Sequence, residues 1–193
     1  MTSNNMLDVF QRHKYDQTIV KKSKTWFDQQ TLLLMKEGVR PTRVHKSGGQ
    51  VVSTIKPGNL YMFFYDPKGK DTLPHYDRFP LVFPFSKTEN GFIGLNMHYL
   101  PTRLRVVLLD NLLKFKNTKT IDENTRLRYS WNVLKGISKH RLVTPCVKQY
   151  LTDHVQSQIK MISADNWTTA MMLPVESFAK ESKTKVWKQV GVN

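Results

Sequence analysis

Cysteine is nearly absent from this 193-residue chain, and long apolar runs are missing altogether. The lone thiol, Cys146, excludes an internal disulfide and fits a reducing compartment. The apolar run at residues 32–35 has four residues and no run has more than six, far short of the about 20 residues that span a membrane. The first sixteen residues contain no apolar core segment, which excludes a signal peptide. We therefore expect a soluble protein made in the cytoplasm, with no membrane partner.

Motifs for catalysis and metal binding are missing as well. No two of the six histidines lie closer than fourteen residues, whereas zinc sites usually pair histidines about three to five residues apart. The sequence has no nucleophile elbow, phosphate-binding glycine loop, paired-histidine metalloprotease motif or dinucleotide fingerprint. We interpret His98 as a hydrogen-bonded histidine at a sheet edge. The sequence thus predicts no catalytic, cofactor-binding or metal-binding residue, and a protein that is not an enzyme.

One acidic cluster leaves a remote enzymatic alternative open. Asp66, Asp71 and Asp77 lie close together in sequence, with Lys68 and Lys70 beside them. A metal-dependent nuclease needs carboxylates that converge with a lysine on a metal ion. The segment 66–69, however, is typical of a type I turn, and the loop continues after it. A structural role is therefore the favoured interpretation of these aspartates.

Acidic residues are scarce relative to basic ones. The chain has 30 Lys and Arg against 15 Asp and Glu, a formal net charge of +15. A charge so far from zero costs self-repulsion and usually accompanies an anionic partner. Residues 1–47 carry nine basic against four acidic residues, residues 48–100 five against four, and residues 101–193 sixteen against seven. The excess lies in the two flanks, although a solvated lysine-rich helix surface is the ordinary alternative.

Aromatic residues are abundant in the nearly neutral centre of the chain. Between Asn59 and Phe85 they alternate with prolines and a short turn, a pattern typical of strands joined by tight connections. We predict strands over residues 51–55, 60–65, 81–85 and 92–99. The predicted fold is α+β, with a small antiparallel sheet or an SH3-like, partly closed barrel formed by residues 51–99. A helical arm (1–47), the β unit (48–100) and a basic helical annex (101–193) would pack as one compact domain.

Helical signals flank the β unit on both sides. The N-terminal arm has an apolar pattern that predicts helices over residues 5–12 and 18–37, followed by a flexible connection at 45–50. Pro101 opens a leucine-rich helix, and Asp122 or Asn124 could cap a helix over residues 124–137. Thr144 and a following proline predict another helix reaching residue 155. Residues 158–162 could rejoin the sheet as a strand, residues 163–171 form a capped short helix, and residues 175–179 form a short helical turn.

Candidate contacts to an anion come from the basic annex. Basic residues interleaved with aromatic ones can hold phosphate groups while a ring stacks on a base. The ordinary alternatives are a solvated helix face paired with Asp110 or Glu123, and a tryptophan that only anchors the C-terminal segment. The candidate nucleic-acid contacts are Arg103, Arg105, Lys183, Lys185, Lys188 and Trp187.

Several phrases of the sequence resemble one protein family. They are YMFFYDPKGKDTLPHYDRFPLVFPF, GFIGLNMHYLP, LLDNLL, TPCVKQYL and KVWKQ, and the resemblance covers most of residues 18–190. The chain is similar to small virion structural proteins of T4-like contractile-tailed bacteriophages. The resemblance implies a virion component without catalytic residues, either in the tail or baseplate or at the DNA ends when the head is completed.

Two functions therefore compete, besides the remote nuclease. The leading hypothesis is a non-enzymatic structural protein that docks to neighbouring tail or baseplate subunits in a symmetric, multi-copy assembly. The alternative is a protein that binds double-stranded DNA and protects or guides its ends. Both place the protein in the virion, and neither requires a cofactor.

Overall fold

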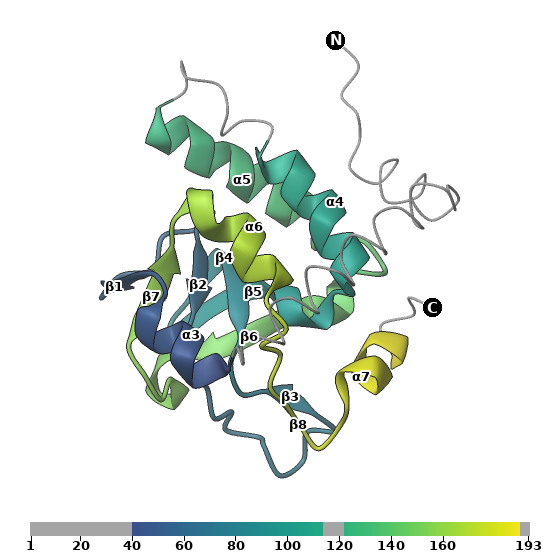
Figure 1. Cartoon of the computed structure of the whole chain (residues 1–193). Helices are drawn as coiled ribbons and strands as arrows, with labels where there is room; N and C mark the ends of the chain where they lie inside the picture. Colours follow the sequence, from purple (N-terminus) through teal and green to yellow (C-terminus); the bar gives the residue numbers. More distant parts are fainter. Residues whose placement is uncertain (1–39, 114–121, 190–193) are drawn as a thin grey trace.

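The computed structural model describes residues 40–113 and 122–189 of the chain. Within these residues the fold is α+β, with an antiparallel six-stranded sheet and helices against it (Figure 1). The helices predicted over residues 5–12 and 18–37 lie outside the described residues. The described part of the predicted N-terminal arm contains one short helix, α3 (Pro41–Ser47), whose last three residues fall in the connection predicted over 45–50.

The main sheet has the strand order β1-β7-β2-β4-β5-β6. Its outer strands, β1 and β6, do not pair with each other, so the sheet is open. The predicted antiparallel sheet is therefore confirmed, and the alternative of a partly closed barrel is not. A second, two-stranded sheet joins β3 to β8. The strands are β1 (Gln50–Val52), β2 (Leu60–Met62), β3 (Tyr76–Asp77), β4 (Leu81–Thr88), β5 (Gly91–Asn96), β6 (Val147–Leu151), β7 (Ile159–Ile162) and β8 (Phe178–Ala179).

Two strands of the main sheet come from beyond the predicted range 51–99. The strand predicted at 158–162 is confirmed as β7, which lies between β1 and β2. The helix predicted after Thr144 is wrong: a single 3₁₀ turn over Thr144–Cys146 leads directly into β6, which pairs with β5 over five residues. The predicted helical turn at 175–179 is also wrong, since β8 pairs with β3 there.

Two helices begin where the sequence predicted. Helix α4 (Thr102–Leu113) follows Pro101, and α5 (Glu123–Ile137) is capped by Asp122, whose carboxylate accepts a hydrogen bond from the Thr125 amide at 3.0 Å. Helix α6 (Trp167–Met172) follows a 3₁₀ turn (Ala164–Asn166) inside the predicted short helix. The C-terminal segment forms α7 (Lys183–Gln189).

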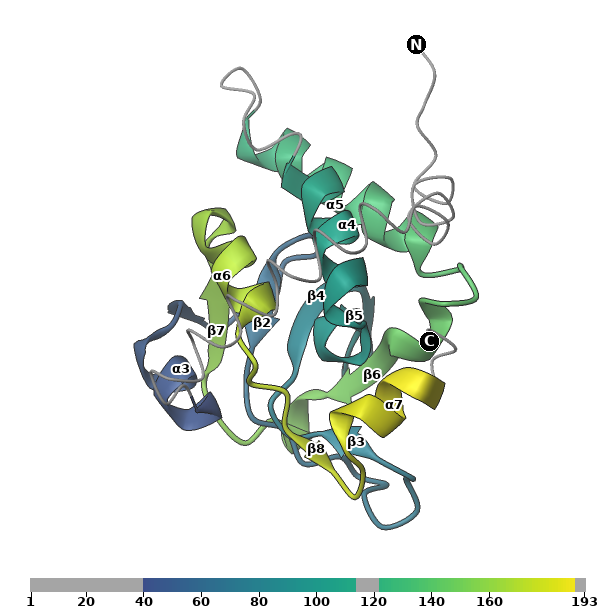
Figure 2. The same ribbon diagram turned by 45° about the vertical axis from the view of Figure 1, so that its right-hand side comes forward.

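The sheet separates two apolar cores. Figures 1 and 2 show α4 and α6 side by side over one face, where leucines of α4 pack on alternate residues of β2, β4 and β5. The other face carries a smaller, mainly aromatic cluster of Tyr61, Phe63, Tyr65, Val82, Phe92 and Tyr150. In Figure 1, α5 lies towards the upper left and α7 at the lower right. In the described part of the chain, no helix is long and apolar enough to cross a membrane.

Candidate nucleic-acid interface

Arg105, one of the predicted anion contacts, lies inside the protein. Its side chain is only 1 % exposed, so a phosphate cannot reach it. The guanidinium donates to the carbonyl oxygens of Leu100, Met171 and His98, and to the Glu176 carboxylate at 2.6 Å. Its acidic partner is therefore Glu176, which is distant in sequence. Because Arg105 is buried, it is no longer a candidate contact for nucleic acid.

Glu176 is the buried counter-charge of this arginine. Burial alone would raise the pKa of the carboxyl, but the positive charges of Arg105, His98 and Lys183 outweigh it and lower that pKa to about 2. The carboxylate is therefore ionised at neutral pH. Arg105 and Glu176 connect α4 to the segment that leads into α7, so the pair fixes the C-terminal part of the chain.

Trp187 anchors α7 to the body of the protein. Its indole nitrogen donates to the His98 carbonyl oxygen at 2.8 Å, and the ring is half-buried. The Arg105 guanidinium lies 5.6 Å from the ring centre and the Lys183 ammonium 5.7 Å from it. The interpretation of Trp187 as a packing anchor is thus confirmed, and the ring is already engaged within the protein.

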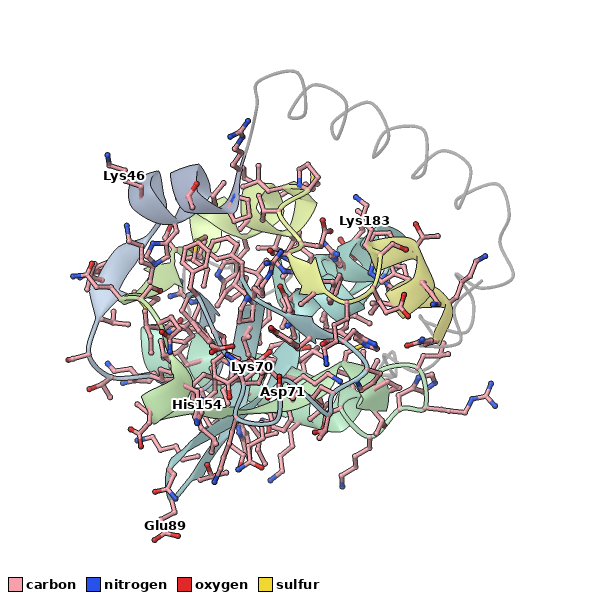
Figure 3. All side chains as sticks on the ribbon, turned by 90° about the horizontal axis from the view of Figure 1, so that it is seen from below. Lys46, Lys70, Asp71, Glu89, His154 and Lys183 are labelled. Carbon is pink, nitrogen blue, oxygen red and sulfur yellow. The ribbon has the colours of Figure 1, made fainter. Side chains whose placement is uncertain are left out.

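Two lysines of α7 face acidic neighbours. The Lys185 ammonium lies 2.6 Å from the Glu181 carboxylate, and that of Lys183 lies 3.9 Å from Glu176. Lys188 is exposed, and Lys183 points outward from α7 in Figure 3. Arg103 lies in the first turn of α4, and its side chain falls outside the described structure. A role for these four residues in nucleic-acid binding stays a prediction.

A basic face that the sequence analysis missed runs along α5. Arg128, Asn132 and Lys135 follow one another at four- and three-residue steps, which place them on one side of a helix. All three are exposed, as is Lys139 in the turn that follows. At 1.5 Å per residue, Arg128 and Lys135 are roughly 10 Å apart along the axis. Arg141, also exposed, extends the positive charge beyond the helix end. We call Arg128, Asn132, Lys135, Lys139 and Arg141 the α5 face.

The opposite side of α5 holds the helix firmly against the sheet. Leu134 and Ile137 are buried there. At the border of the two sides, the Trp131 indole donates to the Phe85 carbonyl oxygen of β4 at 2.7 Å, and the Lys135 ammonium lies 4.6 Å from the centre of the Trp131 ring. Gly58 approaches the backbone of the helix closely with φ +91°, and a Cβ there would lie 2.7 Å from the Leu127 carbonyl oxygen. The α5 face is therefore presented on a fixed element.

A simple signal in the sequence could have located this face. Between Glu123 and Asp153 the chain has no acidic residue, while it has six Lys and Arg. Summing charge over the whole annex, residues 101–193, averages this stretch with the acids that precede and follow it. Arg103 and Arg105 were predicted from their place in the first turn of a helix, whereas the distinguishing feature of α5 is the absence of acidic residues near its cations in the sequence.

The three aspartates of the nuclease alternative do not converge. Asp77 is 4 % exposed, and its carboxylate accepts hydrogen bonds from the His98 ring at 2.8 Å, the Asn96 amide and the Phe79 backbone. Asp66 instead pairs with Lys70 at the surface, 2.7 Å away, and Asp71 is exposed. Across residues 40–113 and 122–189, no group of three His, Cys, Asp or Glu could hold a metal ion.

His98 is correctly predicted as hydrogen-bonded but wrongly placed at an edge. His98 is fully buried in the 3₁₀ turn that follows β5. Because β5 lies between β4 and β6, it is not an edge strand. The Nδ1 atom of the His98 ring lies 2.8 Å from the Asp77 carboxylate. Tyr150 accepts from Asn96 in the same cluster, and burial, with the nearby Asp77 charge, raises the pKa of Tyr150 well above its ordinary value. The cluster is closed to substrates and holds the sheet to the 3₁₀ turn.

Fold and site together describe a class of protein: a basic α+β protein with a cationic helix face. The model of the family described as Phage T4 terminal DNA protecting protein matches residues 6–192. The chain therefore belongs to this family, which confirms the resemblance to T4-like phage proteins. No curated protein and no solved structure matches the chain significantly.

Proposed function

We propose that this protein binds the ends of double-stranded phage DNA and protects them, and that the α5 face contacts the DNA backbone. The single observation that carries the assignment of the surface is the exposed, acid-free basic face of α5. The family's description supplies the ligand, duplex ends. The family's description favours the hypothesis that the protein binds DNA ends. Docking to subunits of the tail or baseplate, the other hypothesis from the sequence, finds no support.

The geometry of the α5 face suits sequence-independent binding. Arginine and lysine neutralise phosphates and release counterions, a source of affinity that depends little on base sequence. Arg128 and Lys135 lie about two helical turns apart, so they would reach different phosphates of one strand. A protein that covers ends of any sequence needs this kind of contact, because base-edge hydrogen bonds would restrict it to particular ends.

Protection without catalysis is the mechanism we propose. A bound protein shields the terminal phosphodiester bonds by occupying the space that an exonuclease needs. This role requires affinity for the end and slow dissociation, and it needs neither a metal ion nor a nucleophile. We further propose that the protein acts in the virion at head completion, where it would meet other phage proteins.

The test combines binding with protection of a linear duplex from a double-strand exonuclease. The variant Arg128→Ala/Lys135→Ala/Lys139→Ala removes three charges from the α5 face. A matched control, Lys46→Ala/Lys68→Ala/Arg78→Ala, removes one arginine and two lysines from exposed positions elsewhere. The wild type and the control should delay digestion, and the α5 variant should not. Equal protection by the two variants would contradict the assignment of the surface, and no protection by the wild type would contradict the function.

A further inference from the structure

An aromatic ring, that of Trp131, borders the α5 face between two of its cations. Arg128 precedes Trp131 by three residues and Lys135 follows it by four, a spacing that places the three side chains along one side of a helix. Arg128 and Lys135 are exposed, whereas Trp131 is half-buried. The α5 face therefore combines positive charge with part of an aromatic ring.

The indole of Trp131 is held in one orientation. Its nitrogen donates to the Phe85 carbonyl oxygen of β4 at 2.7 Å, and Leu134, three residues further along α5, is buried in the larger core. Because the polar group of the indole already has a partner within the protein, it is not available to a ligand. What a ligand can contact is the flat apolar face of the ring.

Lys135 covers this face only loosely. Its ammonium lies 4.6 Å from the centre of the Trp131 ring, yet the lysine side chain as a whole is exposed. Since an exposed lysine lies over the ring, that face of the indole is turned towards the surface. A cation–π contact at an exposed site is weak, and a phosphate offers the ammonium a stronger, charged partner. Lys135 can therefore move from the ring to a phosphate and uncover the ring as it does so.

Trp187 shows the contrasting arrangement. The guanidinium that lies 5.6 Å from the centre of its ring belongs to Arg105, which is buried and paired with Glu176. This cation is held in place by its carboxylate and cannot leave the ring for a phosphate. Of these two rings, Trp131 is therefore the one that an approaching nucleic acid can uncover.

We infer that the Trp131 ring stacks on the terminal base pair of a DNA duplex, while Arg128 and Lys135 hold phosphates beside it. The inference rests on the proposed function and specifies which residue distinguishes an end from internal duplex. Inside a duplex both faces of each base pair are covered by its neighbours, so a ring can stack there only if the duplex is unstacked. The terminal pair leaves one face uncovered, and an aromatic side chain can stack on any base. The α5 cations thus bind any duplex, and Trp131 adds affinity only at an end.

The experiment compares two duplexes with the same paired sequence, one with open blunt ends and one whose ends are closed by short stacked loops that cover the terminal pairs. Stacking of a base on an aromatic side chain changes affinity by about 5- to 150-fold. The full-length wild type should therefore bind the open duplex at least about 5-fold more tightly. Trp131→Leu should reduce this preference to about one-fold, and it should leave affinity for the closed duplex within about 2-fold of the wild type because the cations remain.

Two further variants separate stacking from a defect in folding. Trp131→Phe keeps an aromatic ring but loses the hydrogen bond to Phe85, and it should retain most of the preference. Trp187→Leu makes the leucine substitution at another half-buried tryptophan whose nitrogen donates to a carbonyl oxygen, and it should keep the preference. Equal losses in the two Trp131 variants would assign the effect to the hydrogen bond and contradict stacking. Loss of the preference in Trp187→Leu would contradict the assignment to Trp131.

Indole fluorescence gives a second readout, because stacking on a base quenches it. The open duplex should quench the fluorescence of the wild type more strongly than the closed duplex does. In Trp131→Phe this difference should disappear even though the preference in binding remains. Equal quenching of the wild type by both duplexes would overturn the inference.

Failure of this inference differs from failure of the proposed function. A wild type that binds both duplexes equally, or a Trp131→Leu variant with an unchanged preference, overturns the role of Trp131 and leaves the α5 cations as the proposed contact. Unchanged binding of both duplexes by Arg128→Ala/Lys135→Ala/Lys139→Ala overturns the proposed surface instead. Loss of binding to both duplexes in that variant, with loss of the preference alone in Trp131→Leu, supports both proposals.

Discussion

Removing charge from the α5 face should change how DNA binding responds to salt. Four exposed cations lie on this face or just beyond it: Arg128, Lys135, Lys139 and Arg141. If each neutralises one phosphate, the logarithm of the binding constant falls with the logarithm of salt concentration at a slope of about −3.6. Wild-type affinity would then fall about 150-fold between 50 and 200 mM salt. Alanine at the first three positions should bring the slope to about −0.9, a loss of only about 3-fold over the same range.

Fluorescence anisotropy with a labelled linear duplex is a suitable assay. The slope is more informative than a single dissociation constant, since it counts the phosphate contacts that were lost. The control Lys46→Ala/Lys68→Ala/Arg78→Ala lowers the net charge by the same amount and should leave the slope within about one unit of the wild type. A slope that changes equally in the two variants would show that overall charge attracts the DNA, and the reasoning from the α5 face would fail.

Three further predictions concern the stability of the frame that presents these sites, and chemical denaturation can measure each. Arg105→Met leaves the Glu176 carboxylate buried without its partner and should lower the free energy of unfolding by about 3–5 kcal/mol. Lys185→Met breaks an exposed ion pair and should lower it by less than about 1 kcal/mol. Similar losses of stability in the two variants would contradict a stabilising role for the buried pair. Because the folded-state pKa of Glu176 is about 2, below its ordinary 4.5, its contribution is complete above pH 4.5 and is lost as the pH falls towards 2. That loss is on the order of 3 kcal/mol, and Glu176→Gln should remove this part of the pH dependence. Gly58→Ala should cost about 1–3 kcal/mol, because residue 58 has a positive φ and its new Cβ would meet the α5 backbone. Gly69→Ala, whose Cβ would have its nearest neighbour at 3.5 Å, should change stability little.

Local sequence signals predicted most of the regular elements correctly. The start of α4 after Pro101 and the cap of α5 at Asp122 depend on interactions within a few residues, so the pattern of the chain is sufficient to find them. Strands β2, β4 and β5 were found because aromatic and β-branched runs between turn residues have few alternatives. The predicted divisions at residues 47 and 100 stay a prediction.

The errors occur where distant pairing decides the structure. Residues 147–151 follow Thr144 and Pro145, which resemble a helix start, and Val147 and Leu151 are one helical turn apart. These residues also fit a strand, and the pairing of Tyr150 with Phe92 of β5 decides in favour of the strand. The same applies to the site. Nothing near Arg105 in sequence shows that Glu176, 71 residues later, will bury it.

Charge compensation explains why α5 and α7 differ although both are basic helices. The positive charge of α7 lies near Glu176 and Glu181, and the low pKa of Glu176 keeps that carboxylate ionised at every physiological pH. A phosphate approaching α7 must therefore compete with carboxylates that are already in place. The stretch that contains α5 has no acid between Glu123 and Asp153, so its cations have no carboxylate close by in the sequence, although the Lys135 ammonium lies 4.6 Å from the centre of the Trp131 ring. The count of acids near a basic helix, more than the count of lysines, thus marks the surface that is available to DNA.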